Sequence, residues 1–453
     1  MQPLPKEFEE QMKRLLGEAG FFAYLDALNQ PYTRALRVNL LLRPDGTPSC
    51  PIEGLGAPVP WAKGAYFVEG DARPGLSPLH EGGLFYMQEP SALTAVTALD
   101  PQPGERVLDL CAAPGGKSTQ IAALMAGRGL LCCNEPIPSR AQILSRNIER
   151  MGVRNAVVLS AMPDALAPRF PAFFDRILVD APCSGEGMFR RQPEARDEWD
   201  ADAPRRCADR QMEILAQAAK MLRPGGTMVY STCTFNDTEN EGVLKRFLAL
   251  HPEFSLVPFA LPGLPEAKDG YLHLYPHEMR GEGHFVSRLK KADGADKADA
   301  PVQGAPQRKA PARAAAKGKA PAPIALPDVF SDAFAPERLY TAGDALWMLP
   351  EGISIERLSG LRVLRTGLLL AHAEGKRSEP DHALAMALRP EEAARTASLT
   401  QTQALAYQAG ETLSLGDLPG GYTLLCCEGV SLGWGKQAGG LMKNHYPKGL
   451  RRR

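Results

Sequence analysis

Short apolar runs alternate with amphipathic segments through the middle of the chain. This alternation is typical of a parallel sheet with helices on both faces. The strands that it predicts are Arg106–Leu110, Leu130–Asn134, Ala156–Leu159, Arg176–Val179 and Thr227–Ser231. The predicted helices are Ser118–Ala126, Ser139–Met151 and Arg205–Leu222. We therefore expect an α/β core over residues 96–290.

The flanking segments have different patterns. Before residue 96, helical periodicity around Phe8–Leu16 and Gly20–Leu28 precedes an expected strand in RALRVNLLL. Residues 291–323 are rich in Ala, Pro and Lys and hold few large apolar side chains, so we expect a mobile linker, either a solvated spacer or a contact with nucleic acid. Globular composition then returns, with a seam near Leu388–Arg395. The expected units are 1–95, 96–290, 291–323, 324–390 and 391–453.

Composition excludes several classes of protein. The chain has 453 residues, and its 52 Lys and Arg equal its 52 Asp and Glu, so any basic surface must be local. Nine cysteines without C-x-x-C spacing predict a reduced, cytoplasmic protein without structural zinc or another metal. No apolar run is long enough for a membrane span. Nothing indicates an obligatory protein partner, and we expect a monomer.

The C-terminal segment combines cations with rings. Residues 436–453 hold six Lys or Arg and no acid, next to Trp434, His445 and Tyr446. Cations suit phosphates and flat rings suit stacking on unpaired bases, so this segment predicts RNA binding. A disordered basic tail is the alternative for residues 451–453.

The sequence CAAPGGKS, residues 111–118, ends like a phosphate-binding loop. That loop begins with a glycine, but Cys111 occupies the place. Gly115 and Gly116 still permit positive φ and let a ligand approach bare backbone, and Ser118 is placed to cap the following helix. A turn between a strand and a helix at this position is where open α/β sheets bind nucleotides.

Acidic residues follow the next two predicted strands. Glu135 is placed to accept hydrogen bonds from two ribose hydroxyls, and Asp164 to accept one from an adenine amino group. A site for a dinucleotide would also use an acidic residue to bind the ribose, but the G-x-G-x-x-G fingerprint of such sites is absent from this turn. S-adenosylmethionine fits better, because it carries adenosine without phosphates.

Two cysteines follow the fourth and fifth predicted strands. Cys183 lies in DAPCSGEG and Cys233 in STCTF, both turns rich in small polar residues. A methyltransferase acting on nitrogen commonly has an aromatic residue where Cys183 stands. Carbon 5 of cytosine is a poor nucleophile until a thiolate adds to carbon 6, so a reactive cysteine suits methylation at that carbon. A second thiol could help the enzyme's sulfur to leave, whereas the other cysteines are expected to be packing residues.

With these residues the chain resembles the Sun-type RNA cytosine-C5 methyltransferases, in particular their RsmF branch, which modifies small-subunit ribosomal RNA. The motifs that carry the resemblance are QEPSA at 88–92, DLCAAPGGKS at 109–118, DAPCSGEG at 180–187, STCTF at 231–235 and the C-terminal LGWGK and KNHYPKGLR. The resemblance implies a Rossmann-like core with a mostly parallel seven-stranded sheet. It also implies a small α+β N-terminal domain and a PUA-like RNA-binding region at the C-terminus.

The resemblance also implies roles for individual residues. Cys233 would attack carbon 6, Cys183 would promote release of the methylated product, and Asp180 would orient cofactor and base. S-adenosylmethionine would be bound by Cys111, Ala112, Ala113, Pro114, Gly115, Gly116, Lys117, Glu135, Asp164 and Asp180. The substrate would be 16S ribosomal RNA.

Three alternatives stay open at this point. DNA cytosine methyltransferases use the cysteine of the Pro-Cys motif as nucleophile, and on that analogy Cys183 and Cys233 would exchange roles; the Glu-Asn-Val stretch that the analogy also requires is absent downstream. A ribosome-assembly protein that binds RNA without methyl transfer is a second alternative, against which the two thiols argue. A methyltransferase for a small molecule is the third, and the basic, aromatic C-terminus argues against it.

Overall fold

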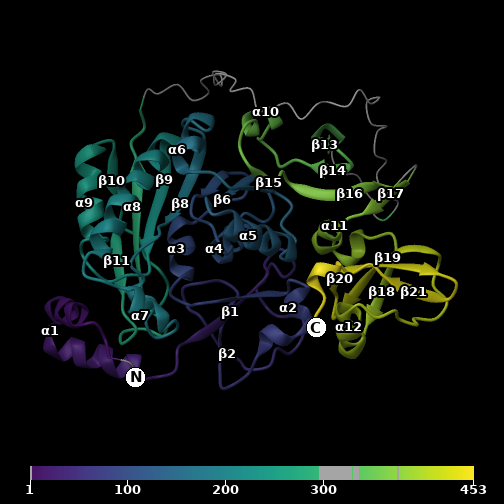
Figure 1. The fold of residues 1–453 in the computed structure, drawn as a ribbon, viewed down its shortest axis with the longest axis horizontal. Helices are drawn as coiled ribbons and strands as arrows, with labels where there is room; N and C mark the ends of the chain where they lie inside the picture. The colour runs from purple at the N-terminus through teal and green to yellow at the C-terminus, as the bar shows by residue number, and fades with distance from the viewer. Residues whose placement is uncertain (1–2, 295–328, 330–335, 375–376, 453) are drawn as a thin grey trace.

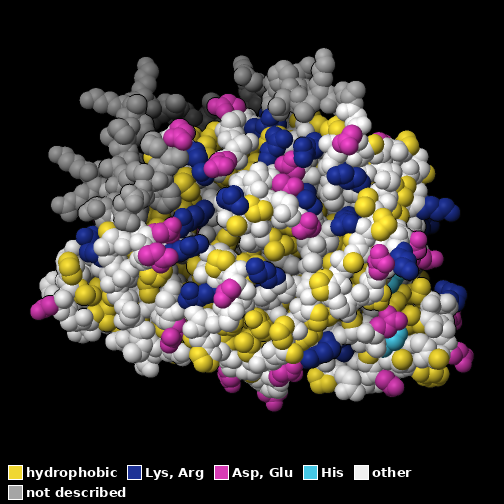
Figure 2. Space-filling view, turned by 180° about the vertical axis from the view of Figure 1, so that it is seen from behind, with side chains coloured by type: hydrophobic (Ala, Val, Ile, Leu, Met, Phe, Trp, Pro, Cys, Tyr) yellow, Lys and Arg dark blue, Asp and Glu magenta, His cyan; other side chains and the backbone are white. Residues whose placement is uncertain are grey.

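The computed structural model describes residues 3–294, 329, 336–374 and 377–452 (Figure 1). Most of the expected linker, residues 295–323, lies outside this described part. None of the described helices combines the length and the apolar character that crossing a bilayer requires. On the face in Figure 2, Lys and Arg side chains lie interspersed with Asp and Glu, as the zero formal net charge leads one to expect.

A nine-stranded sheet forms the centre of the molecule, in the order β10-β12-β9-β8-β5-β6-β7-β15, with β11 paired to β12. Its parallel strands are β5 (Arg106–Asp109), β6 (Leu130–Asn134), β7 (Ala156–Leu159), β8 (Phe174–Asp180) and β9 (Leu222–Thr232). Its antiparallel pairings involve β10 (Phe254–Leu256), β11 (Tyr271–Leu274), β12 (His284–Lys291) and β15 (Val363–Arg365). The Rossmann-like α/β class is confirmed. The sheet exceeds the expected seven strands because β11 and β15 join it.

Helices cover both faces of this sheet. One face is covered by α3 (Leu93–Leu99), α4 (Gly116–Leu124) and α5 (Pro138–Arg150). The other is covered by α6 (Pro163–Leu166), α8 (Ala203–Met221) and α9 (Glu241–Leu250), and a short α7 (Glu194–Glu198) precedes α8. Successive strand residues pack into opposite layers, as the adjacent cysteines illustrate: Cys133 is buried in the layer of α3 and α4, and Cys132 in the layer of α8.

The N-terminal region is a small α+β unit. Helix α1 (Lys6–Leu28) contains a break at Gly17, where φ is 69°, so the two expected helices are joined end to end. Phe8 of α1 packs edge-on against Phe189, which lies in the segment between β8 and α7, with ring centroids 4.9 Å apart. An antiparallel sheet in the order β2-β3-β1-β4 follows. The strands of this sheet are β1 (Arg34–Val38), β2 (Leu55–Pro58), β3 (Ala65–Val68) and β4 (Phe85–Gln88), and α2 (Pro78–Glu81) lies between β3 and β4 in the sequence.

Two four-stranded sheets lie beyond the central sheet. The first contains β13 (Leu339–Ala342), β14 (Ala345–Met348), β16 (Leu368–Glu374) and β17 (Arg377–Pro380), with α11 (His382–Ala387) against it. Helix α10 (Ile355–Leu358) instead packs into the apolar cluster on the α8 side of the central sheet. The second contains β18 (Thr396–Leu399), β19 (Gly421–Cys427), β20 (Val430–Ala438) and β21 (Leu441–Asn444), with α12 (Gln401–Ala409) against it.

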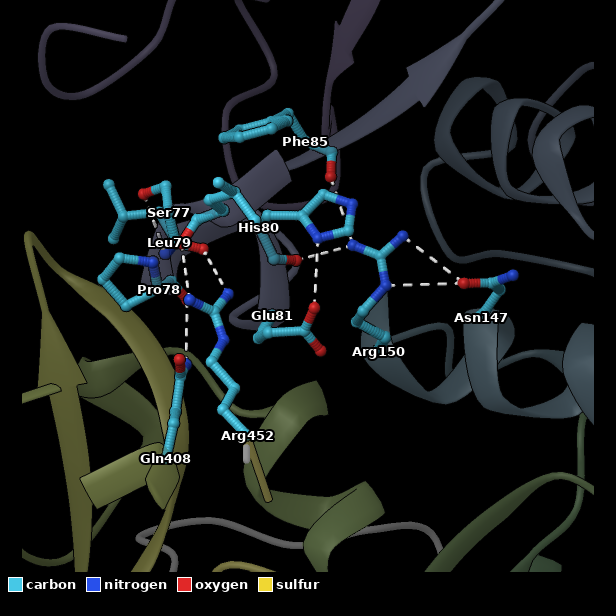
Figure 3. A network of polar contacts seen from close by, with 11 residues as sticks. Ser77, Pro78, Leu79, His80, Glu81, Phe85, Asn147, Arg150, Gln408 and Arg452 are labelled. Atoms are coloured by element: carbon cyan, nitrogen blue, oxygen red, sulfur yellow. Dashed lines mark hydrogen bonds and ion pairs between the residues drawn. The ribbon is translucent and has the colours of Figure 1, made fainter. Parts of the chain in front are cut away.

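The last of these sheets packs against the N-terminal region, although the two are far apart in sequence (Figure 1). Leu36 and Phe85 share one buried apolar cluster with Tyr407, Leu432 and Met442. Polar contacts also cross this junction. The side chains of Gln408 and Arg452 donate hydrogen bonds to the carbonyl oxygens of Pro78 and Ser77, each at 3.0 Å (Figure 3).

Candidate active site

The glycine turn joins β5 to α4 at the carboxyl edge of the sheet. Gly115 has φ of 113° and precedes the first residue of α4, Gly116. A Cβ atom on Gly115 would lie 3.3 Å from side-chain atoms of Leu144 and Asn147, so the turn fits closely against α5. The expectation that Ser118 caps the helix was wrong. Ser118 lies inside α4, and its hydroxyl donates a 2.6 Å hydrogen bond to Asp109.

Asp109 is a buried carboxyl group beneath this turn, and sequence reasoning gave it no role. Its Oδ1 has no hydrogen-bond partner among the described residues. Burial raises the pKa of Asp109 to about 7, although the bond from Ser118 opposes that rise. A signal was present in the sequence, since a carboxylate that ends a buried strand is costly without a partner.

The two cysteines meet at the ends of neighbouring strands. Strands β8 and β9 pair in parallel with Asp180 opposite Ser231, which brings the loops that follow them together. The Sγ atoms of Cys183 and Cys233 are 3.3 Å apart, and both residues are partly buried. The hydrogen bond with Cys233, together with burial, raises the pKa of Cys183 well above its usual range. Cys183 is therefore a neutral thiol at neutral pH.

Asp180 lies at the end of β8 in a web of polar contacts. It accepts a 2.7 Å hydrogen bond from Lys117 Nζ and a 2.8 Å bond from the Ser231 hydroxyl. Burial alone would raise the pKa of Asp180, but the charge of Lys117 holds it well below its usual range. The same ion pair overcomes the burial that would lower the pKa of Lys117 and raises it instead. Buried His284 lies nearby, with Nε2 3.4 Å from Asp180 Oδ1.

Two buried glutamates hold the cysteine loops together, and sequence reasoning missed both. Glu239 accepts hydrogen bonds from the Ser184 amide, at 3.0 Å, and from the side chains of Gln211 and Asn236, each at 2.8 Å. Glu186, in the loop after Cys183, accepts a 2.8 Å bond from the amide of Phe235 in the other loop. The backbone adds a bond from the Gly187 amide to the carbonyl of Cys233 at 2.8 Å. The spacing between the sulfur atoms is therefore fixed by the surrounding loops.

The two other predicted acids differ in their surroundings. Glu135 follows β6 and is 2% exposed; it accepts a 3.0 Å bond from the Ile137 amide and lies 3.4 Å from Arg140. Asp164 is exposed in the first turn of α6, after β7. Two large apolar side chains that sequence reasoning missed are exposed just after these strands, Ile137 at 48% and Met162 at 61%. Exposed apolar side chains beside a polar edge suit a flat, partly apolar ligand such as a purine.

These residues fit S-adenosylmethionine better than a phosphate-bearing nucleotide. The cation of the turn, Lys117, is already paired with Asp180, whereas a phosphate loop needs its lysine for phosphate. Carboxylates at the ends of β5, β6 and β8, namely Asp109, Glu135 and Asp180, favour a ligand with hydroxyl, ammonium and sulfonium groups.

Two of the three rings that were expected to stack on RNA bases at the C-terminus are buried. Trp434 and Tyr446 are 2% and 3% exposed, and the Trp434 indole donates a 2.8 Å hydrogen bond to the carbonyl of Asp381. His445 lies 3.0 Å from Glu379. The prediction that these rings stack on bases was therefore wrong for the tryptophan and the tyrosine. The alternative of a disordered tail was also wrong for Arg452, which bonds to Ser77; Arg453 lies outside the described residues.

Comparison with known proteins gives a consistent result along the chain. Residues 96–290 match the family model described as 16S rRNA methyltransferase RsmB/F. Residues 4–90, 327–388 and 394–452 match models of the N-terminal domain, the first C-terminal domain and the PUA domain of RsmF.

Individual proteins agree with this match. Ribosomal RNA small subunit methyltransferase F of Erwinia tasmaniensis is 34% identical over 98% of this chain and 96% of its own. The protein of the same name from Klebsiella pneumoniae is also 34% identical, over 98% and 96%. The crystal structure of a methyltransferase homolog from Pyrococcus horikoshii is 30% identical, with a TM-score of 0.54 over 63% of this chain and 95% of that one.

Proposed function

The chain belongs to the 16S rRNA methyltransferase RsmB/F family, and from this premise we propose that it forms 5-methylcytosine in 16S ribosomal RNA. In this proposal Cys233 is the nucleophile, Cys183 assists product release and S-adenosylmethionine is the methyl donor. The observation that carries the proposal is the 3.3 Å separation of the two sulfur atoms beside the glycine turn. Two thiols at one sheet edge suit a reaction in which a sulfur–carbon bond must both form and break.

Cys233 begins the reaction by forming a bond from its sulfur to carbon 6 of the cytosine. The electron pair of the 5,6 double bond then becomes available at carbon 5. The Cys233 sulfur lies close enough to Lys117 for its charge to add, after that of Asp180, to the raised pKa of this lysine. S-adenosylmethionine, when bound, supplies the methyl group that carbon 5 receives.

Release requires loss of the carbon 5 proton and cleavage of the bond between Cys233 and carbon 6. The electrons of the departing carbon–hydrogen bond restore the double bond, and the sulfur leaves with the electrons of its own bond to carbon. Cys183 is a neutral thiol whose Sγ is 3.3 Å from that sulfur, so it can donate a hydrogen bond to the leaving thiolate. This stabilises the leaving group and favours product release.

The residues proposed to hold the cofactor divide by the part of the ligand that they suit. The turn at 111–117 offers backbone groups to the methionine end, and Glu135 offers a carboxylate to the ribose. Asp164 would accept a hydrogen bond from the adenine amino group, and the exposed apolar side chains of Ile137 and Met162 would contact the adenine ring. Asp180, fixed by Lys117 and Ser231, would orient cofactor and base.

The test compares two kinds of acceptor with the purified protein and a donor labelled in its methyl group. We expect label in 16S ribosomal RNA and none in a pool of small metabolites, with bisulfite sequencing placing the new group on a cytosine. Cys207→Ala is the matched control for alanine variants of Cys183 and Cys233. Cys207 lies on α8 outside the loops that carry those two cysteines, so this variant should methylate like the native protein. Two outcomes would contradict the proposal: labelled RNA in which bisulfite sequencing finds no 5-methylcytosine, and label in the metabolite pool.

A further inference from the structure

Helix α5 holds the glycine turn from the outside. The Asn147 side chain donates a 2.8 Å hydrogen bond from Nδ2 to the carbonyl oxygen of Pro114. Two turns earlier on the same face, Arg140 donates a 3.3 Å bond to the carbonyl oxygen of Ala113. The Cβ atom of Asn147 also bounds the space beside Gly115. Two consecutive carbonyl groups of the turn are thus fixed by side chains of one helix.

Arg150 fixes which way the Asn147 amide faces (Figure 3). Its Nε and Nη2 atoms each lie 3.4 Å from Asn147 Oδ1, so the amide nitrogen is directed to the turn. Arg150 is itself held from the other side, because its Nη1 donates to the carbonyl oxygens of His80, at 2.6 Å, and Phe85, at 3.3 Å. The orientation of Asn147 therefore depends on α2 and β4 of the N-terminal region.

Asn147 is an unfavourable residue for the interior of helix α5. Asn is a poor helix former, and inside a helix its side chain tends to compete for local backbone groups. Asn147 instead uses its donor on the turn between β5 and α4, 33 residues away in the sequence. Alanine would suit helix α5 better, so the residue serves the contact and not the helix.

We propose that Asn147, oriented by Arg150, is a positioning residue that holds the 113–115 turn in the shape required to bind the methionine end of S-adenosylmethionine. This inference rests on the proposed use of the turn for that cofactor. Without the Asn147 bond, the Pro114 carbonyl is free to turn and the backbone groups of the turn lose their fixed direction. The loss should appear in cofactor affinity and leave the rest of the protein unchanged.

The experiment measures binding of S-adenosylhomocysteine and S-adenosylmethionine by calorimetry to the full-length protein. Asn147→Ala should weaken both about tenfold, the effect of one lost hydrogen bond of roughly 1.4 kcal/mol. Asn147→Asp should weaken them at least as much, because its carboxylate still pairs with Arg150 but cannot donate to Pro114. Gln142→Ala, at an exposed position of the same helix, is the control and should bind like the native protein.

Thermal unfolding of the ligand-free variants and their affinity for 16S ribosomal RNA complete the test. Both should stay at native values in Asn147→Ala, whose alanine favours the helix. Native cofactor affinity in both Asn147 variants would overturn the inference. So would a parallel fall in stability, RNA binding and cofactor binding, which marks a merely structural residue. A native protein that binds the cofactor but does not methylate cytosine would refute the proposed function and leave this inference standing.

Discussion

At the scale of single residues, the candidate site contains ionisable side chains that are buried. Asp180 and Lys117 neutralise each other, whereas Asp109 keeps one oxygen without a partner among the described residues. The first pair stays ionised over the physiological pH range, because each charge favours the other. Asp109 instead changes charge near neutral pH.

Asp109 should therefore make stability depend on pH. Its pKa is raised from 3.8 to about 7, so the folded state binds the proton more tightly and loses stability as pH rises through that interval. Asp109→Asn removes the titration. Measured by urea unfolding, the gain in stability of the variant over the native protein should be about 2.6 kcal/mol larger at pH 8 than at pH 5. An effect of equal size at both pH values would contradict the buried, partly unsatisfied carboxyl.

The sequence could indicate the cysteine pair but not the groups that support it. Cys183 and Cys233 both follow apolar strands of a parallel sheet, and the carboxyl ends of such strands lie at one edge. Which strands are neighbours, and hence that Lys117 reaches Asp180, depends on topology that local patterns do not carry. The C-terminal rings were misjudged for a related reason, since a basic stretch does not reveal that Trp434 is buried.

At the scale of elements, the apolar runs in the sequence predicted the parallel strands of the central sheet. They did not predict β11 and β15, the two strands beyond the expected seven. Strand β15 pairs with β7 although about 200 residues of chain separate them, and its three residues give no clear periodicity. The last residue of this strand, Arg365, is buried and forms an ion pair with Glu149 of α5. The first C-terminal unit is therefore joined to the central sheet by backbone pairing and by a side-chain ion pair.

The loop after α5 makes a second contact of this kind, which a pair of glycines can test. Gly152 and Gly104 both have positive φ, 65° and 93°, so alanine strains either by about 1 kcal/mol. A Cβ atom on Gly152 would also collide with the carbonyl oxygen of Met386 in α11, whereas one on Gly104 would meet nothing within 4 Å. Gly152→Ala should cost at least about 2 kcal/mol more than Gly104→Ala in urea unfolding. Equal costs would mean that the two regions do not pack closely there.

At the scale of the whole molecule, the N- and C-terminal regions form one apolar cluster. Leu432 of β20 is 1% exposed and borders Gly82, at the end of α2. Leu432→Ala should remove about 3 kcal/mol of packing. Hydrogen exchange should then quicken in β1 and β4 as well as in β19 and β20. Leu405→Ala, at a side chain that is 42% exposed, is the control; faster exchange confined to the C-terminal sheet would contradict the shared cluster.

This arrangement places a PUA domain beside the N-terminal region, and that region beside α5, the helix that contacts the glycine turn. RNA held by the outer domains would thus be held relative to the catalytic edge. The sequence predicted an α+β N-terminal domain, a Rossmann-like core and a PUA-like C-terminal region, but not the contacts between them. The residues that join the N- and C-terminal regions, such as Arg452 and Gln408, look like ordinary polar surface residues in the sequence.

The central claim is that Cys233 bonds to the base and Cys183 helps to release it. The most direct measurement is to incubate each alanine variant with 16S ribosomal RNA and S-adenosylmethionine, denature the mixture and look for protein that migrates with RNA. Cys183→Ala should accumulate this covalent complex, because the adduct forms and is not released. Cys233→Ala should be inactive and form none. A complex in Cys233→Ala, or its absence from Cys183→Ala, would contradict the account.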